Sequence, residues 1–119
     1  MILFCDTSAL VNLYVLEDGS DGMAEQAAAS EIIAVCRTSW VEIMSAMARR
    51  SREQPNAAAA INRARKRVVA DWPHYLALEL TQELVELAGD YAEAFALRAH
   101  SSVQLAAART VHQEGANRT

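Results

Sequence analysis

The sequence predicts an α/β domain in which a small parallel sheet carries helices on both faces. Three short apolar runs, at residues 2–5, 32–36 and 75–80, are nearly continuous in hydrophobic residues, as strands covered on both sides are. Segments with helical patterning follow each run, which gives the order β-α-α-β-α-α-β-α-α. Parallel strands require crossovers of this kind, and these crossovers are expected to be right-handed. The 119 residues suit one domain, residues 1–119.

The first half of the chain alternates strand and helix patterns. The run at residues 2–5 leads through Asp6 into a helix over residues 9–14, and residues 17–21 form a loop before an alanine-rich helix that ends near Ser30. Residues 37–39 form a turn and cap for the next helix. Its apolar positions have i, i+3, i+4, i+7 spacing, at Trp40, Ile43, Met44 and Met47.

The second half is predicted to hold three helices and one strand. Pro55 opens a helix that runs to about Ala70, and residues 71–74 break it. Thr81 caps a helix that Arg98, Ala99 and His100 close. Its apolar stripe comprises Leu84, Leu87, Ala88, Tyr91 and Phe95. Residues 101–104 have the form of a capping box, in which Ser101 and Gln104 start a last helix that ends within residues 115–119.

Composition restricts the class of protein. Cys5 and Cys36 lie in apolar runs without Cys or His at ligand spacing, so both are predicted to be buried, reduced thiols. No apolar stretch is long enough to span a bilayer and no basic leader precedes the first acid, so we expect a cytoplasmic protein that does not enter the membrane.

The basic residues are concentrated in the middle of the chain. The net charge of −4 argues against a protein that coats nucleic acid by bulk electrostatics. Seven Lys and Arg residues nevertheless fall within residues 49–67. This cluster is either a positive flank for a phosphate backbone or a solvated helix face.

Two acids are the first candidates for chemistry. Asp6 follows the first strand directly, and Glu42 falls in the first turn of the helix after the second strand. Because parallel strands end at one edge of a sheet, we expect these carboxylates to converge there and to be able to hold a hard divalent cation. The alternative for Asp6 or Thr7 is that it caps the following helix.

Three segments resemble one known family. They are Asp6-Thr7-Ser8-Ala9-Leu10 with Tyr14 and residues 17–20 behind it, then Val41-Glu42, then residues 97–108. Their order and separations are similar to those of the PIN-domain ribonucleases, in particular the VapC-like toxins of type II toxin-antitoxin modules. The resemblance covers nearly the whole chain.

The resemblance implies a PIN-like fold and an endoribonuclease that depends on Mg²⁺ or Mn²⁺ and is held inactive by a VapB-like antitoxin. In such enzymes the metal polarises a phosphate oxygen of RNA and helps to activate a water. Asp6 and Glu42 would then be the catalytic residues and metal ligands. Thr7 and Ser8 would support the site, either by bonding a ligand oxygen or metal-bound water or as helix caps.

The chain departs from the family pattern at two places. Ser101 stands where the family carries a third acid, and the final strand, which a fourth acid usually follows, is lacking. Ser101 offers only a neutral oxygen to a metal, so one weakly held Mg²⁺ is expected rather than two ions, together with weakened RNA cleavage. The missing strand leaves an open sheet edge, which predicts a homodimer. The alternatives are a catalytically inactive PIN-like module that acts through antitoxin or RNA binding, and a decayed product that folds and does little.

Overall fold

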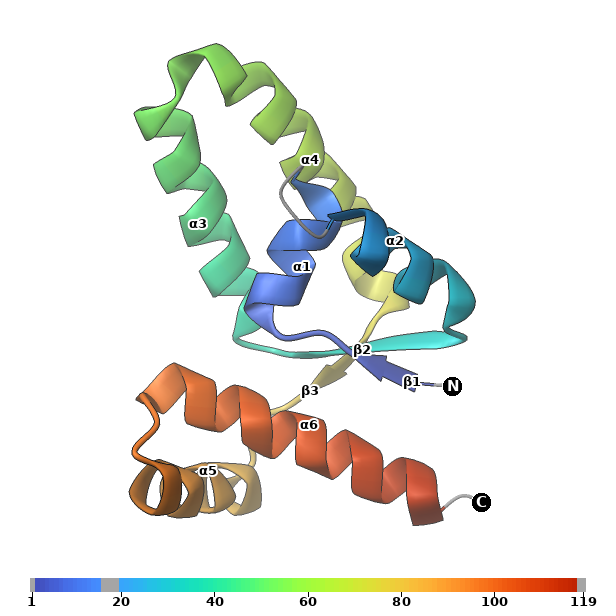
Figure 1. Cartoon of the computed structure of the whole chain (residues 1–119), viewed down its shortest axis with the longest axis vertical. Coiled ribbons are helices and arrows are strands. Elements are labelled where there is room, and N and C mark those ends of the chain that lie inside the picture. Colours follow the sequence, from blue (N-terminus) through green and yellow to red (C-terminus); the bar gives the residue numbers. More distant parts are fainter. Residues whose placement is uncertain (1, 16–19, 118–119) are drawn as a thin grey trace.

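The computed structural model describes residues 2–15 and 20–117 and confirms the predicted α/β architecture (Figure 1). Strands β1 (Ile2–Phe4), β2 (Ile32–Cys36) and β3 (Leu76–Leu78) form a parallel sheet in the order β1-β2-β3. Ile2 pairs with Ile32, and Ala34 pairs with Leu76. Backbone pairing continues past the end of β1, because the Cys5 amide donates to the Ala34 carbonyl at 2.9 Å.

Helices cover both faces of this sheet, as predicted (Figure 1). One face carries α1 (Thr7–Tyr14), α2 (Ser20–Ala29), α3 (Ser39–Glu53) and α4 (Ala58–Asp71), and the other carries α5 (Gln82–Phe95) and α6 (Ala99–Asn117). Two 3-10 turns, η1 (Pro55–Ala57) and η2 (Trp72–His74), flank α4. The predicted loop over residues 17–21 is wrong at its end, because residues 20 and 21 already belong to α2, and its residues 17–19 lie outside the described residues. Residues 118 and 119 at the end of the chain also lie outside them.

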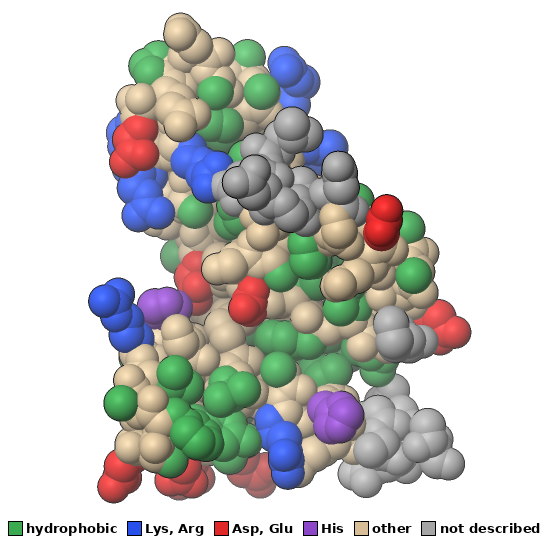
Figure 2. Space-filling model, in the orientation of Figure 1, with side chains coloured by type: hydrophobic (Ala, Val, Ile, Leu, Met, Phe, Trp, Pro, Cys, Tyr) green, Lys and Arg blue, Asp and Glu red, His purple; other side chains and the backbone are tan. Residues whose placement is uncertain are grey.

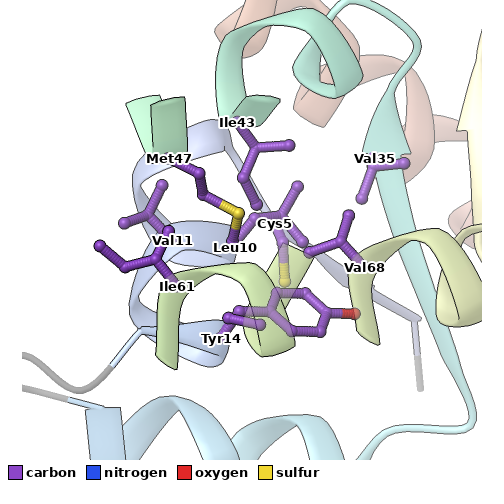
Figure 3. Close-up of a cluster of buried hydrophobic side chains, with 10 residues drawn as sticks. Cys5, Leu10, Val11, Tyr14, Val35, Ile43, Met47, Ile61 and Val68 are labelled. Atoms are coloured by element: carbon purple, nitrogen blue, oxygen red, sulfur yellow. The ribbon is translucent and has the colours of Figure 1, made fainter. Parts of the chain in front are cut away.

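Side chains alternate between two cores, as the two-residue period of a strand requires. Cys5 and Val35 point into the core beneath α1, α3 and α4, where Leu10, Ile43 and Val68 pack (Figure 3). The full set of buried residues in this core is Cys5, Leu10, Val11, Tyr14, Val35, Ile43, Met47, Ile61, Ala64 and Val68.

The opposite face of the sheet packs on the second core. Cys36 lies there with Leu84 and Ala88 of α5 and with Ala106 and Ala107 of α6. Small residues on α6 allow this helix to approach the sheet closely. Both cysteines are free and fully buried, which confirms their predicted state.

The boundary between α5 and α6 differs from the prediction. Thr81 caps α5, since its Oγ1 accepts from the Leu84 amide at 3.1 Å. The helix ends at Phe95, before Arg98, because Ala96 adopts the left-handed conformation at φ 53° and reverses the chain. Phe95 is 61% exposed and does not continue the apolar stripe. A sequence pattern gives no sign of a left-handed alanine, since glycine is the usual residue there.

The predicted capping box at Ser101 and Gln104 is wrong for the same reason. Helix α6 begins at Ala99, so both residues lie inside it. The Ser102 hydroxyl donates to the Arg98 carbonyl at 2.9 Å, and the Gln104 amide donates to side chains of other helices. Gln104 is therefore a long-range contact rather than a local cap.

The start of α3 also differs in detail. Thr38 occupies the N-cap position, but its side chain makes no capping hydrogen bond and lies 3.2 Å from Cys36 Sγ. Trp40 packs edge-to-face on Trp72, with ring centroids 5.3 Å apart, as its predicted packing role requires.

Within residues 2–15 and 20–117 no helix combines the length and the apolar character needed to cross a bilayer.

Candidate functional site

A cavity of about 410 Å³ opens at the carboxyl end of β1, beside the first turns of α1, α3 and α6. The side chains that line it include every residue predicted for the site: Asp6, Thr7, Ser8, Glu42 and Ser101. They come from three segments of the sequence, the first and last of which are more than 90 residues apart. Figure 2 shows Asp and Glu side chains at the hollow between the upper part of the molecule and the part formed by α5 and α6.

The position of Asp6 is compatible with both roles that the sequence left open, helix cap and ligand at the cavity. Its Oδ1 accepts from the Ala9 amide at 2.8 Å, so the carboxylate caps α1. The same side chain is exposed and lines the cavity. Its second oxygen has no hydrogen-bond partner among the described residues. Capping thus fixes the carboxylate at the cavity and leaves one oxygen available to a ligand.

Glu42 is held in the cavity by Thr7. The Thr7 hydroxyl donates to Glu42 Oε2 at 2.7 Å, which joins the first turn of α1 to the first turn of α3. A hydrogen bond to a carboxylate is among the stronger kinds in proteins. Thr7 therefore orients a candidate ligand, and Glu42 Oε1 has no partner in the described part of the chain.

Two further residues, Ser39 and Gln104, extend this contact into the interior. Ser39 is fully buried, and Gln104 is 7% exposed. Gln104 Nε2 lies 3.0 Å from Ser39 Oγ and 3.4 Å from Thr7 Oγ1, and Ser39 Oγ lies 3.1 Å from Thr7 Oγ1.

The direction of these hydrogen bonds follows from the number of protons that each group can donate. A hydroxyl has one proton, and that of Thr7 goes to the carboxylate of Glu42, the strongest acceptor within reach. Ser39 therefore donates to Thr7, and the Gln104 amide donates to Ser39. The result is a directional network, Gln104 to Ser39 to Thr7 to Glu42, which ends on the acid in the cavity.

The sequence pattern does not predict this role for Ser39 and Gln104. It places Ser39 in a turn and makes Gln104 a capping partner for Ser101. The available signal was an amide within Val103–Ala108, a segment of otherwise apolar residues that packs against the sheet. A buried polar side chain on such a face needs a partner from another element.

Ser8, His100 and Ser101 complete the polar wall of the cavity. His100 is predicted to close the preceding helix, but it lies in the first turn of α6 and lines the cavity. None of the three side chains makes a hydrogen bond to another described residue. They add polar groups to the cavity but do not hydrogen-bond to Asp6 or Glu42.

The types of donor at the cavity are those that one hydrated divalent cation accepts. Asp6 and Glu42 each keep one unbonded carboxylate oxygen, and Gln104 Oε1 is buried without a hydrogen-bond partner in the structure as described. Mg²⁺ is commonly held by one or two carboxylates and several waters. No group of three or more His, Cys, Asp or Glu side chains capable of holding a metal occurs within the described ranges. Two carboxylates neutralise only one divalent ion, so the arrangement does not fit a pair of ions.

A second polar cluster joins α1 to the end of α4 on the far side of the first core. The Tyr14 hydroxyl donates to Asp71 Oδ2 at 2.7 Å and contacts the Tyr75 hydroxyl, and Arg67 donates to the Tyr14 carbonyl at 2.8 Å. Burial raises the pKa of both tyrosines above the ordinary value. Since its polar groups satisfy one another, this cluster serves to hold the helices together.

Comparison with protein-family models and with curated proteins gives no significant match to this sequence.

Proposed function

We propose that this chain is a VapC-like PIN-domain endoribonuclease, which hydrolyses phosphodiester bonds of RNA with Mg²⁺ or Mn²⁺ as its cofactor. One observation carries the proposal: Asp6 and Glu42, brought by two different crossovers, line a single cavity at the carboxyl end of β1. An acidic cavity of this kind attracts a cation, and a cation in turn attracts a phosphate group.

The residues of the chain would divide the work as follows. Asp6 and Glu42 would hold the cation, which would supply Lewis-acid polarisation of a phosphate oxygen and activation of a water. The network from Gln104 through Thr7 keeps Glu42 in one orientation. Ser101 offers a neutral oxygen where a third carboxylate would bind more strongly, so we expect metal affinity and cleavage rate to be reduced.

A second candidate function is an inactive PIN-like module that acts by binding an antitoxin or RNA. The serine at position 101 favours this alternative, since the described residues supply only two carboxylates to the cavity. The two functions differ in whether the wild-type chain cleaves RNA at all.

RNA cleavage in Mg²⁺ and in Mn²⁺ separates these functions. The proposed enzyme predicts slow cleavage by the wild-type chain, loss of cleavage in Asp6→Asn, and faster cleavage in Ser101→Asp. Cleavage that appears only in Ser101→Asp would instead assign the wild-type chain to the inactive module. Cleavage that persists in Asp6→Asn would contradict both assignments of the cavity.

The partners proposed with this function are RNA, a VapB-like antitoxin and a second copy of the chain. Within the described residues β1 and β3 each pair with β2 alone, so both edges of the sheet offer unpaired backbone groups. A homodimer is a means of covering such an edge. Light scattering at high concentration that detects monomer alone would contradict the dimer.

A further inference from the structure

Helix α3 leads directly from the acidic cavity to the basic part of the molecule. Glu42 lies in its first turn, and Arg49 follows seven residues later. At 3.6 residues a turn and 1.5 Å a residue, Arg49 lies about 20° around the helix from Glu42 and about 10 Å along it. Ser45 and Arg52 also lie within a quarter turn around the helix from Glu42. We call these four residues, Glu42, Ser45, Arg49 and Arg52, the α3 stripe.

The α3 stripe is open to solvent over its whole length beyond the cavity. Ser45, Arg49 and Arg52 are exposed, as is Ala48 beside them. Neither arginine forms an ion pair or a hydrogen bond with another described residue. Because Ser45 and Ala48 are small, an extended chain is able to lie close to the helix between the cavity and the arginines.

Charge is divided unevenly between this region and the rest of the chain. Residues 49–67 carry seven of the 11 Lys and Arg residues and one of the 15 Asp and Glu residues. Figure 2 shows most Lys and Arg side chains over the upper part of the molecule, where Figure 1 places α3 and α4. A polyanion approaching the acidic cavity is therefore attracted by α3 and α4 and repelled by most of the remaining surface.

We propose that Arg49 and Arg52 bind the phosphate backbone of single-stranded RNA and lead it along α3 toward Glu42. The planar guanidinium group suits phosphate, which it binds through two parallel hydrogen bonds. Two such groups about one turn apart on an open line match a chain of regularly spaced charges. An acidic protein segment would need apolar contacts as well, and the exposed side chains beside the arginines, Ser45 and Ala48, offer little apolar surface.

This inference rests on the proposed function for the position of the scissile bond, but the binding surface itself requires no metal. Glu53 ends α3 about 40° around the helix from Arg49, so its carboxylate opposes phosphate binding at the far end of the stripe. Removal of the charge of Arg52 should therefore weaken RNA binding, and removal of the charge of its neighbour Glu53 should strengthen it.

The test measures how tightly the full chain binds a labelled single-stranded RNA oligonucleotide in EDTA. Fluorescence anisotropy reports the binding at several salt concentrations. We expect Arg49→Gln with Arg52→Gln to weaken binding about tenfold at low salt and to flatten the slope of log K against log salt by about 1.4. Glu53→Gln should strengthen binding. The matched control, Arg65→Gln with Lys66→Gln on α4, removes the same charge and should change affinity much less.

Equal losses in the two double variants would overturn the proposal, because they would show attraction by net charge alone. An unchanged salt slope in the α3 variant, or weaker binding by Glu53→Gln, would do the same. If polyglutamate competes as effectively as RNA, the surface binds an acidic protein and not RNA. If the stripe binds RNA but the chain cleaves none in Mg²⁺ or Mn²⁺, the proposed function fails and this inference stands.

Discussion

The Thr7 hydroxyl and the Glu42 carboxylate, 35 residues apart in the chain, meet at 2.7 Å and join α1 to α3 at the mouth of the cavity. Without this bond Glu42 is free to turn toward solvent. We expect Thr7→Val to lower Mn²⁺ affinity several-fold and to destabilise the fold by about 1–2 kcal/mol, because a hydrogen bond to a charged group is lost. Calorimetric titration with Mn²⁺ and chemical denaturation measure the two effects.

Thr7→Ser is the matched control, since it keeps the hydroxyl and removes one methyl group. Its Mn²⁺ affinity should stay close to that of the wild type. Equal losses in the serine and valine variants would assign the effect to packing at position 7 and not to the orientation of Glu42.

Asp6 allows its capping role and its charge to be separated. Asn is as good an N-cap as Asp, whereas Ala loses the bond to the Ala9 amide and about 1 kcal/mol of stability. We therefore expect Asp6→Asn to keep the thermal stability of the wild type, Asp6→Ala to lower it, and both to lose Mn²⁺ binding and RNA cleavage. Retained Mn²⁺ affinity in Asp6→Asn would remove Asp6 from the proposed ligands.

Gln104 connects α6 to this arrangement through Ser39. Gln104→Leu leaves the Ser39 hydroxyl without its buried donor, and we expect a loss of about 1–3 kcal/mol in the free energy of unfolding together with weaker Mn²⁺ binding. Ser102→Ala is the control. It removes a buried hydroxyl of α6 whose bond, to the Arg98 carbonyl, stays near the start of the same helix. Mn²⁺ affinity that falls equally in both variants would contradict a specific role for the network.

The sheet and the position of Asp6 and Glu42 at one cavity were predictable because both depend on local patterns and on one topological rule. Apolar runs marked the strands, and parallel pairing brings the segments after β1 and β2 to one edge, which places Asp6 and Glu42 at a shared cavity. The pairing of Ser39 with Gln104 was not predictable in this way. It joins residues 65 positions apart, and no local preference of either residue specifies the other.

Alkaline pH should lower the stability of the fold through Cys5. Burial, with a contribution from the charge of Asp6, raises the pKa of this thiol to about 11 from 9.0. Between these values the native chain binds more protons than the unfolded chain, so the free energy of unfolding falls as the pH rises. The contribution is complete below pH 9 and disappears by about pH 11, and a shift of this size corresponds to about 2–3 kcal/mol.

Cys5→Ala should therefore flatten the dependence of stability on pH in this range, although it loses some core packing at every pH. Tyr14, whose pKa burial also raises, adds a fall of the same sign at higher pH. Urea denaturation at intervals from pH 8 to 11 measures the slope, and identical slopes for the wild type and Cys5→Ala would refute this account.

Ala96 offers a test of the turn between α5 and α6. It is the only non-glycine residue with positive φ among the described positions, at φ 53°. An L-residue with a Cβ atom in this conformation costs about 1 kcal/mol relative to glycine, which adopts it freely. Part of the stability gained with glycine is offset because glycine has more freedom in the unfolded chain, so we expect Ala96→Gly to raise the free energy of unfolding by about 0.5–1 kcal/mol.

The control, Ala94→Gly inside the last turn of α5, should lower the free energy of unfolding by a similar amount. Opposite signs for two identical substitutions two residues apart would follow only if α5 ends where the left-handed residue places it, and a loss of stability in Ala96→Gly would show that the chain turns elsewhere.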